Sequence, residues 1–263
     1  MDLLADTHLH LYPCYDLDRA FSRLLDQLGG GALRAGFLAE RADCHVYEQL
    51  RCGDILLRDF TLEAADRRQL VLRRGSDGSR LCLLPGRQIV AAERIEVLAL
   101  CTDALFADGL PAAELIKSIR AGNGVPVLPW SPGKWLFQRG RVIDGLLRQF
   151  SGQDLLIGDV SLRPAGWPLP PLLRKARCLG YQMICGSDPL PFSGEEDKFG
   201  SCGSRLTAAA ELEPDALLRA LLQGKAAASS VGRRSGLLEL LRRLRRNAAV
   251  RRAASSVQHK EKT

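Results

Sequence analysis

The stretch Asp2-Leu-Leu-Ala-Asp6-Thr-His8-Leu-His10 begins as an apolar run and ends in alternating polar side chains. A short apolar run of this kind is typical of a buried strand. Successive side chains of an extended segment point to opposite faces, so Asp6, His8 and His10 project together if the strand continues that far. Two imidazoles held in this way are good ligands for a divalent metal. The alternative is a pair of histidines bonded to backbone at a strand end.

Outward from this stretch, segments of strand and helix character alternate along the chain. Residues 16–28 carry leucine and phenylalanine at helical spacing and are followed by three glycines, which predicts a helix after the first strand. Further strands are expected at 35–39, 97–101, 125–128, 154–157 and 182–185, and further helices at 111–120, 142–150, 170–179 and 214–222. Such alternation with short connections favours parallel strands wound with helices, here an α/β barrel of TIM-like type.

One segment departs from the alternation. Residues 69–74 and 80–84 have strand character, and the turn sequence Gly75-Ser-Asp-Gly78 lies between them, so we expect a β-hairpin, either as an insertion or as an antiparallel edge. The chain has 263 residues, of which 46% are hydrophobic and 25% charged. A single barrel of this length needs no second domain.

The cysteine content and the N-terminal sequence predict a soluble, cytoplasmic protein. The eight cysteines are scattered and form no Cys-x-x-Cys pair, which favours reduced thiols. The chain begins without the basic start and long apolar run of a signal peptide. No apolar run approaches the roughly 18 residues of a membrane span.

Positive charge is concentrated at the C-terminal end. Residues 225–263 hold eleven Lys and Arg against two Glu, a formal charge of +9, whereas the whole chain carries +7, so residues 1–224 carry −2. Leucines alternate with arginines from Leu237 to Arg252, as in a basic amphipathic helix. We therefore divide the chain into a barrel domain, residues 1–224, and a basic, amphipathic, partly disordered tail, residues 225–263, with disorder expected after Ala253.

The tail has three candidate partners. A cationic amphipathic helix can dock on an anionic membrane surface, on nucleic acid or on an acidic groove of a partner protein. The alternative is a solvated extension without a partner.

Carboxylates at other expected strand ends can complete a metal site with the two histidines. Asp188, in Gly186-Ser-Asp188-Pro189, follows the last strand of the alternation, where it would bind a metal or take a proton from a bound water. The alternative is an Asx-turn before the proline. Glu40 follows the second strand, and its alternative role is a surface ion pair. Other candidate ligands are Glu93, Glu96, Asp159 and, as a loop residue, His45.

Basic residues near expected strand ends can recognise an anion. Lys134 stands between two tryptophans in Trp130-Ser-Pro-Gly-Lys134-Trp135, and Arg163 and Arg205 follow similar turns. We expect these three cations to bind a phosphate or carboxylate of the substrate. The alternatives are a turn packed on the core for Lys134 and structural ion pairs for the arginines. The sequence around Lys134 lacks the spacing of a nucleotide-binding loop.

These motifs, in this order, resemble the polymerase and histidinol phosphatase (PHP) superfamily and, more loosely, the amidohydrolases and TatD-like nucleases. The resemblance spans residues 2–224 and rests on the Asp-x-His-x-His start, the carboxylate after the second strand, Gly124-Val-Pro-Val-Leu-Pro129 and Gly186-Ser-Asp188. It implies a distorted seven-stranded α/β barrel that holds up to three divalent metals and hydrolyses phosphoesters. It also implies that His8 and His10 are the paired ligands of the first motif, that Glu40 stands at the Asp of Thr-Asp-His, and that Asp188 matches the final Ser-Asp.

The sequence departs from the family pattern at four positions. Arg41, Gln88, Trp130 and Leu190 stand where the family has His, Glu, His and His, so most imidazoles of a three-metal site are absent. The remaining set is His8, His10, Glu40 and Asp188. Two nitrogens and two carboxylates can hold one zinc, manganese or iron ion and leave a position open for water, so we expect a single metal.

Two functions are consistent with this sequence. The first, which the motifs favour, is an enzyme: a metal-dependent hydrolase that cleaves a phosphoester with a metal-activated water, Asp188 serving as proton acceptor. The second is a catalytically degenerate barrel that binds a ligand or a partner in place of turning over a small anionic or phosphorylated substrate, as the missing histidines and the basic tail suggest. Under either hypothesis no expected ligand lies beyond Asp188, so deletion of the chain after Gly232 is expected to leave metal binding intact.

Overall fold

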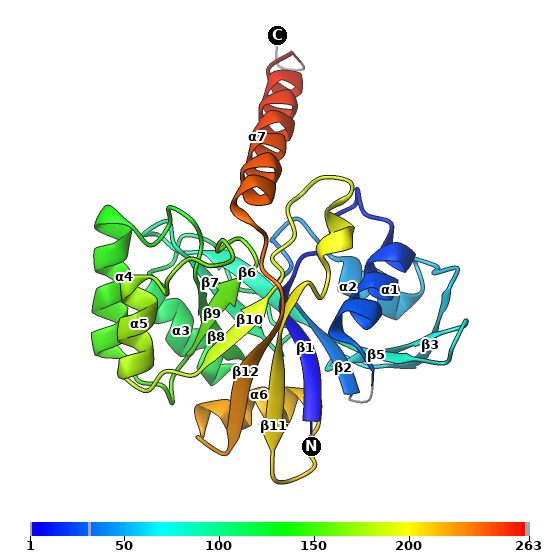
Figure 1. Cartoon of the computed structure of the whole chain (residues 1–263), viewed down its shortest axis with the longest axis horizontal. Helices are drawn as coiled ribbons and strands as arrows, with labels where there is room; N and C mark the ends of the chain where they lie inside the picture. The colour runs from blue at the N-terminus through cyan, green and yellow to red at the C-terminus, as the bar shows by residue number, and fades with distance from the viewer. Residues whose placement is uncertain (1, 31–32, 261–263) are drawn as a thin grey trace.

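The computed structural model describes residues 2–30 and 33–260, with side chains described through residue 253. Within these residues the chain forms a mixed α/β fold of seven α-helices and two mixed β-sheets (Figure 1). The helices are α1 (Leu17–Leu28), α2 (Val46–Cys52), α3 (Ala112–Ala121), α4 (Phe137–Gln149), α5 (Pro171–Cys178), α6 (Pro214–Leu222) and α7 (Leu237–Lys260), and a short 3-10 helix covers Glu195–Lys198.

The first sheet has seven strands in the order β12-β11-β1-β2-β5-β4-β3. Strand β1 is an interior strand of this sheet, parallel to β2 and antiparallel to β11. The strands are β1 (Asp2–Leu9), β2 (Leu33–Leu38), β3 (Phe60–Ala65), β4 (Leu70–Arg74), β5 (Arg80–Leu84), β11 (Cys202–Ala208) and β12 (Ala226–Gly232).

The second sheet has five strands in the order β10-β9-β8-β7-β6. Strands β8, β9 and β10 are parallel, whereas β7 runs antiparallel to both of its neighbours. The strands are β6 (Gly86–Val90), β7 (Glu96–Leu100), β8 (Val125–Pro129), β9 (Leu156–Val160) and β10 (Met183–Gly186).

The two sheets contact each other at both edge strands of the second sheet, β10 and β6. At β10, the Asp188 N–H donates to the His8 carbonyl at 3.0 Å, and Thr7 Oγ1 donates to the Cys185 carbonyl at 2.8 Å. At β6, a parallel bridge joins Glu40 to Arg87. Because these contacts are isolated bonds, the pairing of the described strands gives two sheets and no closed barrel, and the distorted barrel stays a prediction.

Most of the expected elements form, but their directions differ in part. The hairpin over residues 69–84 is confirmed, since Leu70–Arg74 pairs antiparallel with Arg80–Leu84. The expectation of uniformly parallel strands is wrong around β7. There α3 returns the chain to the end of the sheet where β7 finishes, so Leu100 lies opposite Val125 and β8 runs back along β7.

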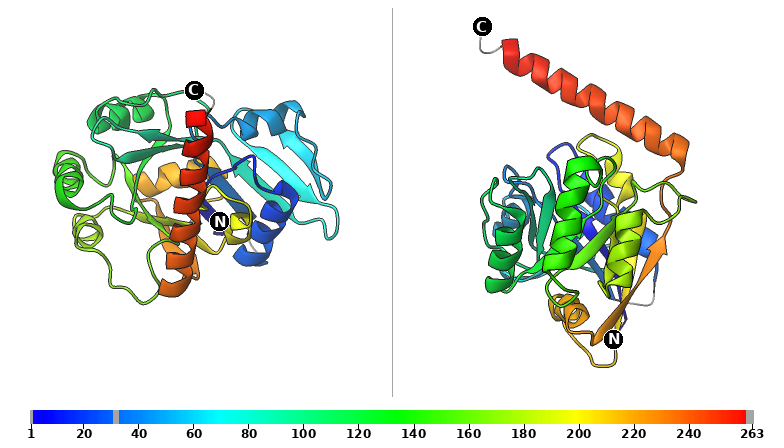
Figure 2. Two further views of the ribbon diagram at one scale, coloured as in Figure 1. Left: turned by 90° about the horizontal axis from the view of Figure 1, so that it is seen from above. Right: turned by 90° about the vertical axis from the view of Figure 1, so that its left-hand side faces the viewer.

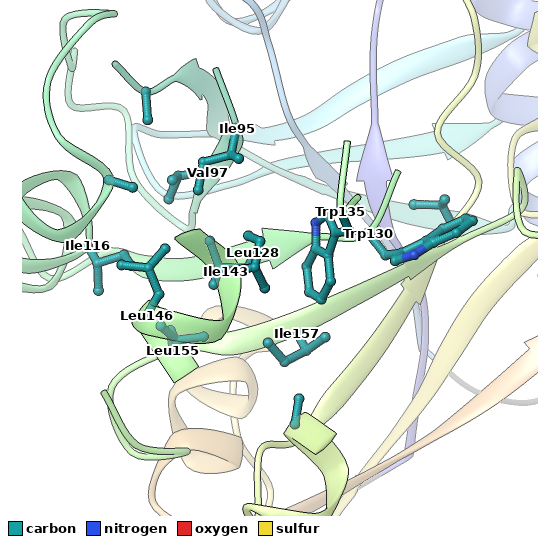
Figure 3. Packing of buried hydrophobic residues seen from close by; sticks show 14 of the residues in the cluster. Ile95, Val97, Ile116, Leu128, Trp130, Trp135, Ile143, Leu146, Leu155 and Ile157 are labelled. Carbon is teal, nitrogen blue, oxygen red and sulfur yellow. The ribbon is translucent and has the colours of Figure 1, made fainter. Parts of the chain in front are cut away.

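A hydrophobic core holds α3, α4 and α5 against the second sheet (Figure 3). Helix α4 buries Ile143, Leu146 and Leu147, spaced three and four residues apart, because this spacing places apolar side chains on one helix face. They pack in one cluster with Leu128 and Ile157 of the sheet. Burial of each such side chain contributes about 1.5–3 kcal/mol to the stability of the fold.

The segment expected to be a tail contributes to the folded body. Residues Ala226–Gly232 form strand β12, which pairs along its whole length with β11, so the expected boundary at residues 224–225 precedes a strand of the sheet. Helix α7 then leaves the sheet and lies across the top of the molecule (Figures 1 and 2). Its first turns bury Leu240 and Arg243. Of the region where disorder was expected, α7 extends to Lys260, and residues 261–263 lie outside the described residues.

None of the described helices has the length and apolar character that crossing a membrane would require.

Gly186 permits the close approach of the two sheets at β1 and β10. A Cβ built on Gly186 would lie 2.4 Å from the His8 nitrogen and 2.5 Å from the His8 Cβ, so the strands would have to separate to admit one.

We expect Gly186→Ala to lower the free energy of unfolding by about 1–3 kcal/mol, the usual cost of overpacking. The matched control is Gly145→Ala in the middle of α4, where a new Cβ meets no atom within 4 Å. That change should raise stability by about 0.5–1 kcal/mol, because alanine favours helix. Urea denaturation of both variants measures the difference, and equal stabilities would show that the strands do not depend on this contact.

Candidate metal centre

Three side chains from distant parts of the chain converge at the end of β1. His8 lies in β1 and His10 directly after it, and both are buried. Asp188 follows β10. The Nε2 atoms of the two histidines are 3.1 Å apart, and the Asp188 Oδ1 atom lies 3.8 Å from His8 Nε2 and 3.5 Å from His10 Nε2. Within the described part of the chain, these residues place one ligand atom each within 4.8 Å of the others.

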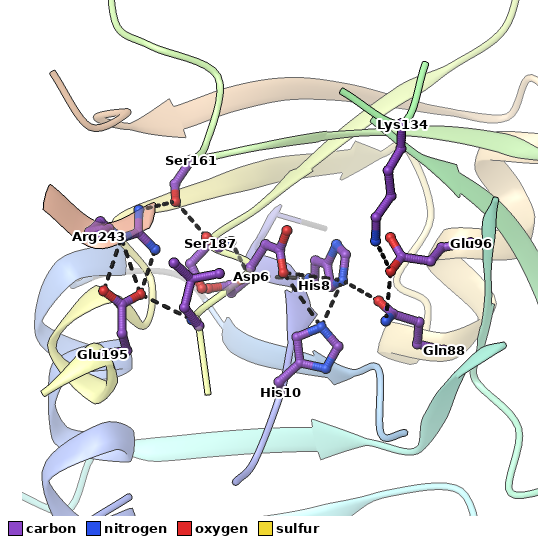
Figure 4. A network of polar contacts seen from close by, with 12 residues as sticks. Asp6, His8, His10, Gln88, Glu96, Lys134, Ser161, Ser187, Glu195 and Arg243 are labelled. Atoms are coloured by element: carbon purple, nitrogen blue, oxygen red, sulfur yellow. Dashed lines mark hydrogen bonds and ion pairs between the residues drawn. The ribbon is translucent and has the colours of Figure 1, made fainter. Parts of the chain in front are cut away.

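The Asp6 carboxylate fixes the backbone around this group. Its Oδ1 atom accepts from the backbone N–H groups of His8 at 3.2 Å and Ser187 at 2.9 Å, and its Oδ2 atom accepts from Gly200 N–H at 2.9 Å (Figure 4). Complete burial raises the pKa of Asp6 to about 6, although these hydrogen bonds oppose the shift. Asp6 therefore joins three chain segments, and its carboxylate is outside the group of three ligand atoms.

The electrostatics of the group favour the protonation states that bind metal. Burial lowers the pKa of His8 below its ordinary value, with the Asp188 carboxylate opposing the shift, so the His8 ring is neutral near pH 7. Burial by itself would raise the pKa of Asp188, but the imidazole of His8 and the hydrogen bond with His10 hold it below the usual range. A neutral imidazole and an ionised carboxylate are the forms that ligate divalent cations.

The distances between the ligand atoms fit a single divalent ion. Bonds from zinc to imidazole nitrogen or carboxylate oxygen are about 2.0–2.2 Å, so ligand atoms around a tetrahedral ion lie roughly 3.4 Å apart. The observed separations of 3.1, 3.5 and 3.8 Å bracket this value. Neither buried Nδ1 atom of His8 or His10 has a hydrogen-bond partner among the described residues, and the His10 ring is oriented instead by stacking on Tyr12. Three protein ligands with an open position are typical of catalytic rather than structural zinc sites.

A chain of polar contacts links the group to Lys134 (Figure 4). Gln88 Oε1 lies 3.4 Å from His8 Nε2, and Gln88 Nε2 donates to Glu96 Oε1 at 3.2 Å. Glu96 in turn forms an ion pair with Lys134.

In the sequence Gln88 was visible as a departure from the family pattern, and Glu96 as one of several carboxylates near strands. Because β7 is antiparallel, its first residue lies at the edge where the parallel strands end.

Glu40, the fourth expected ligand, has another role in this structure. Its Oε1 atom accepts from the Tyr47 N–H at 2.9 Å at the start of α2, and its Oε2 atom is 4.0 Å from the Arg87 guanidinium. Burial raises the pKa of Glu40. The carboxylate therefore contacts the N-terminus of α2 and is not among the three grouped ligands. The backbone of Glu40 also bonds across the junction of the two sheets, to Gly86 and Gln88.

The three expected anion-binding residues are separated in space. Arg163 is buried and forms a two-pronged ion pair with Asp159, at 2.7–3.2 Å. Arg205 forms an ion pair with Asp2, at the opposite end of β1 from the histidines. Lys134, in contrast, lines the same cleft as His10 and Asp188. The sequence shows which residues are basic, but the partner of each is set by strand direction and packing.

A cleft of about 510 Å³ opens directly on the metal-ligand group. Besides His10, Asp188 and Lys134, it is lined by Arg41 and, from the C-terminal helix, by Leu244, Asn247 and Arg251. From the sequence, α7 was expected to belong to a separate tail, and its contribution to the cleft was not predicted. The spacing of residues 240, 244, 247 and 251 places them on one face of α7 but does not say what that face contacts.

Solved structures with a similar fold have very different sequences. PsfC from Pseudomonas syringae PB-5123 is 18% identical with a TM-score of 0.60, over 96% of this chain and 99% of that chain. The lesion-specific endonuclease PfuEndoQ from Pyrococcus furiosus is 11% identical with a TM-score of 0.53, over 88% of this chain. A complex of Endonuclease Q with a 27-mer duplex that carries an abasic lesion at the active site is 10% identical with a TM-score of 0.52, also over 88% of this chain.

These similarities establish likeness of fold. This chain spans 59% and 60% of the length of the two endonuclease chains. No family profile and no curated protein sequence matches the chain.

Replacement of both His8 and His10 by alanine should abolish metal binding and leave the fold intact, because only Asp188 of the group remains. Elemental analysis of the purified protein and circular dichroism test this. The control is His45→Ala, which removes an exposed histidine whose ring contacts Arg87 outside the group. Equal metal content in the double variant and the wild type would place the metal elsewhere.

Proposed function

We propose that this protein is a metal-dependent hydrolase of PHP-like type that cleaves a phosphoester. The observation that carries the proposal is the convergence of His8, His10 and Asp188 at a cleft. His10 and Asp188 line this cleft, and its other charged lining residues are the cations Arg41, Lys134 and Arg251 and the carboxylates Asp43, Glu96 and Asp108. These three residues would hold one divalent ion, zinc, manganese or iron. The binding energy for the substrate comes from the ion and from the cations around the cleft.

The chain's own residues have distinct tasks in this mechanism. When bound, a divalent ion at this position supplies a water of lowered pKa as the nucleophile. Asp188 would be the carboxylate ligand of such an ion and would accept the proton of its water. His8 and His10 would supply the two imidazole nitrogen ligands of the ion. Gln88 places its amide oxygen next to His8, and its amide nitrogen donates to Glu96.

Lys134 is the residue we assign to the phosphate. It lines the cleft, and its partner Glu96 is one of the lining residues, so an incoming phosphate competes with a carboxylate already present for the same ammonium group. The two tryptophans that flank Lys134 in sequence are core residues, and the Trp135 indole N–H donates to the Pro129 carbonyl at 3.0 Å. They hold the turn in place, and the ammonium group is the part available to a ligand.

Phosphomonoesters and phosphodiesters are both substrates to test. The fold is shared with endonucleases, which cleave phosphodiesters, and a single metal with nearby cations can serve either ester. The second candidate function, a degenerate binding protein, is favoured by Gln88 and Arg41 at positions where the family has metal ligands. Turnover separates the two, because a binding protein would hold metal and anion without releasing product.

The wild-type protein loaded with Mn²⁺ or Zn²⁺ should hydrolyse at least one ester from a panel of aryl phosphates, nucleoside monophosphates and abasic-site DNA duplexes. Asp188→Asn keeps the volume and removes the charge and the proton acceptor, so the rate should fall at least about 10²-fold. Asp43→Asn changes another carboxylate at the cleft, outside the three-ligand group, and is the control. Metal-loaded protein that binds phosphate without turnover would support the binding-protein function instead.

Lys134→Met should raise KM for the phosphoester about tenfold or more, because an anion at the cleft loses its nearest ammonium partner. Arg205→Met is the matched control: it removes an equally basic side chain at the far end of β1 and should leave KM unchanged. Steady-state kinetics of the two variants test the assignment. Equal KM values for Lys134→Met and the wild type would remove Lys134 from substrate binding.

A further inference from the structure

A buried arginine fastens α7 to the body of the protein beside the candidate metal centre. The Arg243 guanidinium donates to both oxygens of Glu195, at 2.6–3.1 Å, and to the hydroxyl groups of Ser161 at 3.1 Å and Ser235 at 3.0 Å (Figure 4). Arg243 and Glu195 are 5% and 3% exposed. Removal of one partner of such a pair leaves a buried charge without compensation, which is strongly unfavourable.

The partners of Arg243 reach the two sides of the turn that carries Asp188. On one side, the Glu195 Oε2 atom accepts from the Leu190 N–H at 3.0 Å. On the other side, the Ser161 hydroxyl donates to the carbonyl of Ser187. Arg243 therefore contacts, through one intermediate on each side, the residue before Asp188 and the second residue after it.

The backbone of Asp188 needs this support. Its φ is +47°, in the left-handed region that residues other than glycine rarely adopt. A residue held there is strained and persists only where the surrounding structure enforces the conformation. The bonds at Ser187 and Leu190, together with the bond from the Asp188 N–H to the His8 carbonyl, supply that enforcement.

We propose that Arg243 is a positioning residue for the metal ligand Asp188, and that docking of the C-terminal helix completes the metal site. This inference rests on the proposed function, because it takes the three-residue group as the metal site. Helix α7 also supplies Leu244, Asn247 and Arg251 to the wall of the cleft. Helix α7 therefore belongs to the site. Deletion of the chain after Gly232 is then expected to weaken metal binding, whereas the sequence alone predicts that metal binding stays intact.

The test is a comparison of two arginine variants of the full-length chain. Arg243→Met removes the contacts to Glu195 and Ser161. Arg246→Met, one turn later on α7, removes a hydrogen bond to the Ser193 carbonyl and a contact 4.7 Å above the Phe192 ring. Both variants lose one charge and a similar volume and both weaken the attachment of α7, but Arg246 has no bond to Glu195 or Ser161.

The dissociation constant for Mn²⁺ is measured by calorimetry on metal-free protein, and the absorption spectrum of the Co²⁺ form reports the coordination geometry. Arg243→Met should weaken Mn²⁺ binding about 10- to 100-fold, the usual effect of losing a partner that orients a metal ligand. It should also change the Co²⁺ spectrum. Arg246→Met should stay within about threefold of the wild type, with an unchanged spectrum. Equal effects of the two variants would overturn the proposal, because the role of Arg243 would then be structural only.

Ser161→Ala keeps the test decisive if Arg243→Met fails to fold. It removes the bond to the Ser187 carbonyl and leaves the Arg243–Glu195 pair intact, and we expect Mn²⁺ binding to weaken several-fold. Unchanged Mn²⁺ affinity in folded Ser161→Ala would count against the proposal. A wild-type chain that binds no metal would overturn the proposed function together with this inference. A chain that binds metal equally well in the wild type and in Arg243→Met would overturn the inference alone.

Discussion

The close approach of β1 and β10 is the constraint on which the rest of the site depends. It joins the two sheets through the bond from the Asp188 N–H to the His8 carbonyl and leaves no room for a Cβ on Gly186. The buried Asp6 carboxylate binds N–H groups on both sides of this junction. Both histidines come from one sheet and the aspartate follows the other, so the three ligand atoms meet only because the sheets do.

Two buried carboxylates near the junction, Asp159 and Glu195, form ion pairs with arginines from later segments of the chain. Asp159 forms ion pairs with Arg163 of the following turn and with Arg234 of the segment after β12. Glu195 receives Arg243 from α7. A buried ion pair adds little net stability compared with apolar packing, but its directional hydrogen bonds can select one arrangement of the chain. Here they determine where the C-terminal segment attaches, beside the candidate metal centre.

The positions at which this sequence departs from the PHP pattern lie mostly at the cleft. Arg41, Gln88 and Leu190 line it, whereas Trp130 is buried in the core beside the second sheet. The cleft therefore has a cation, an amide and an apolar side chain where the pattern would place metal ligands.

The sequence by itself determined the local features of this protein. Apolar periodicity indicated most helices and strands, the glycine turn at residues 75–78 indicated the hairpin, and alternation in the first strand placed His8 and His10 together, because each depends on neighbouring residues alone. The tertiary structure decided which distant groups meet. Glu40 contacts the start of α2, Arg205 pairs with Asp2, and α7 docks beside Asp188. These outcomes depend on strand direction, sheet pairing and the partners available to each buried charge, and residue spacing carries no record of them.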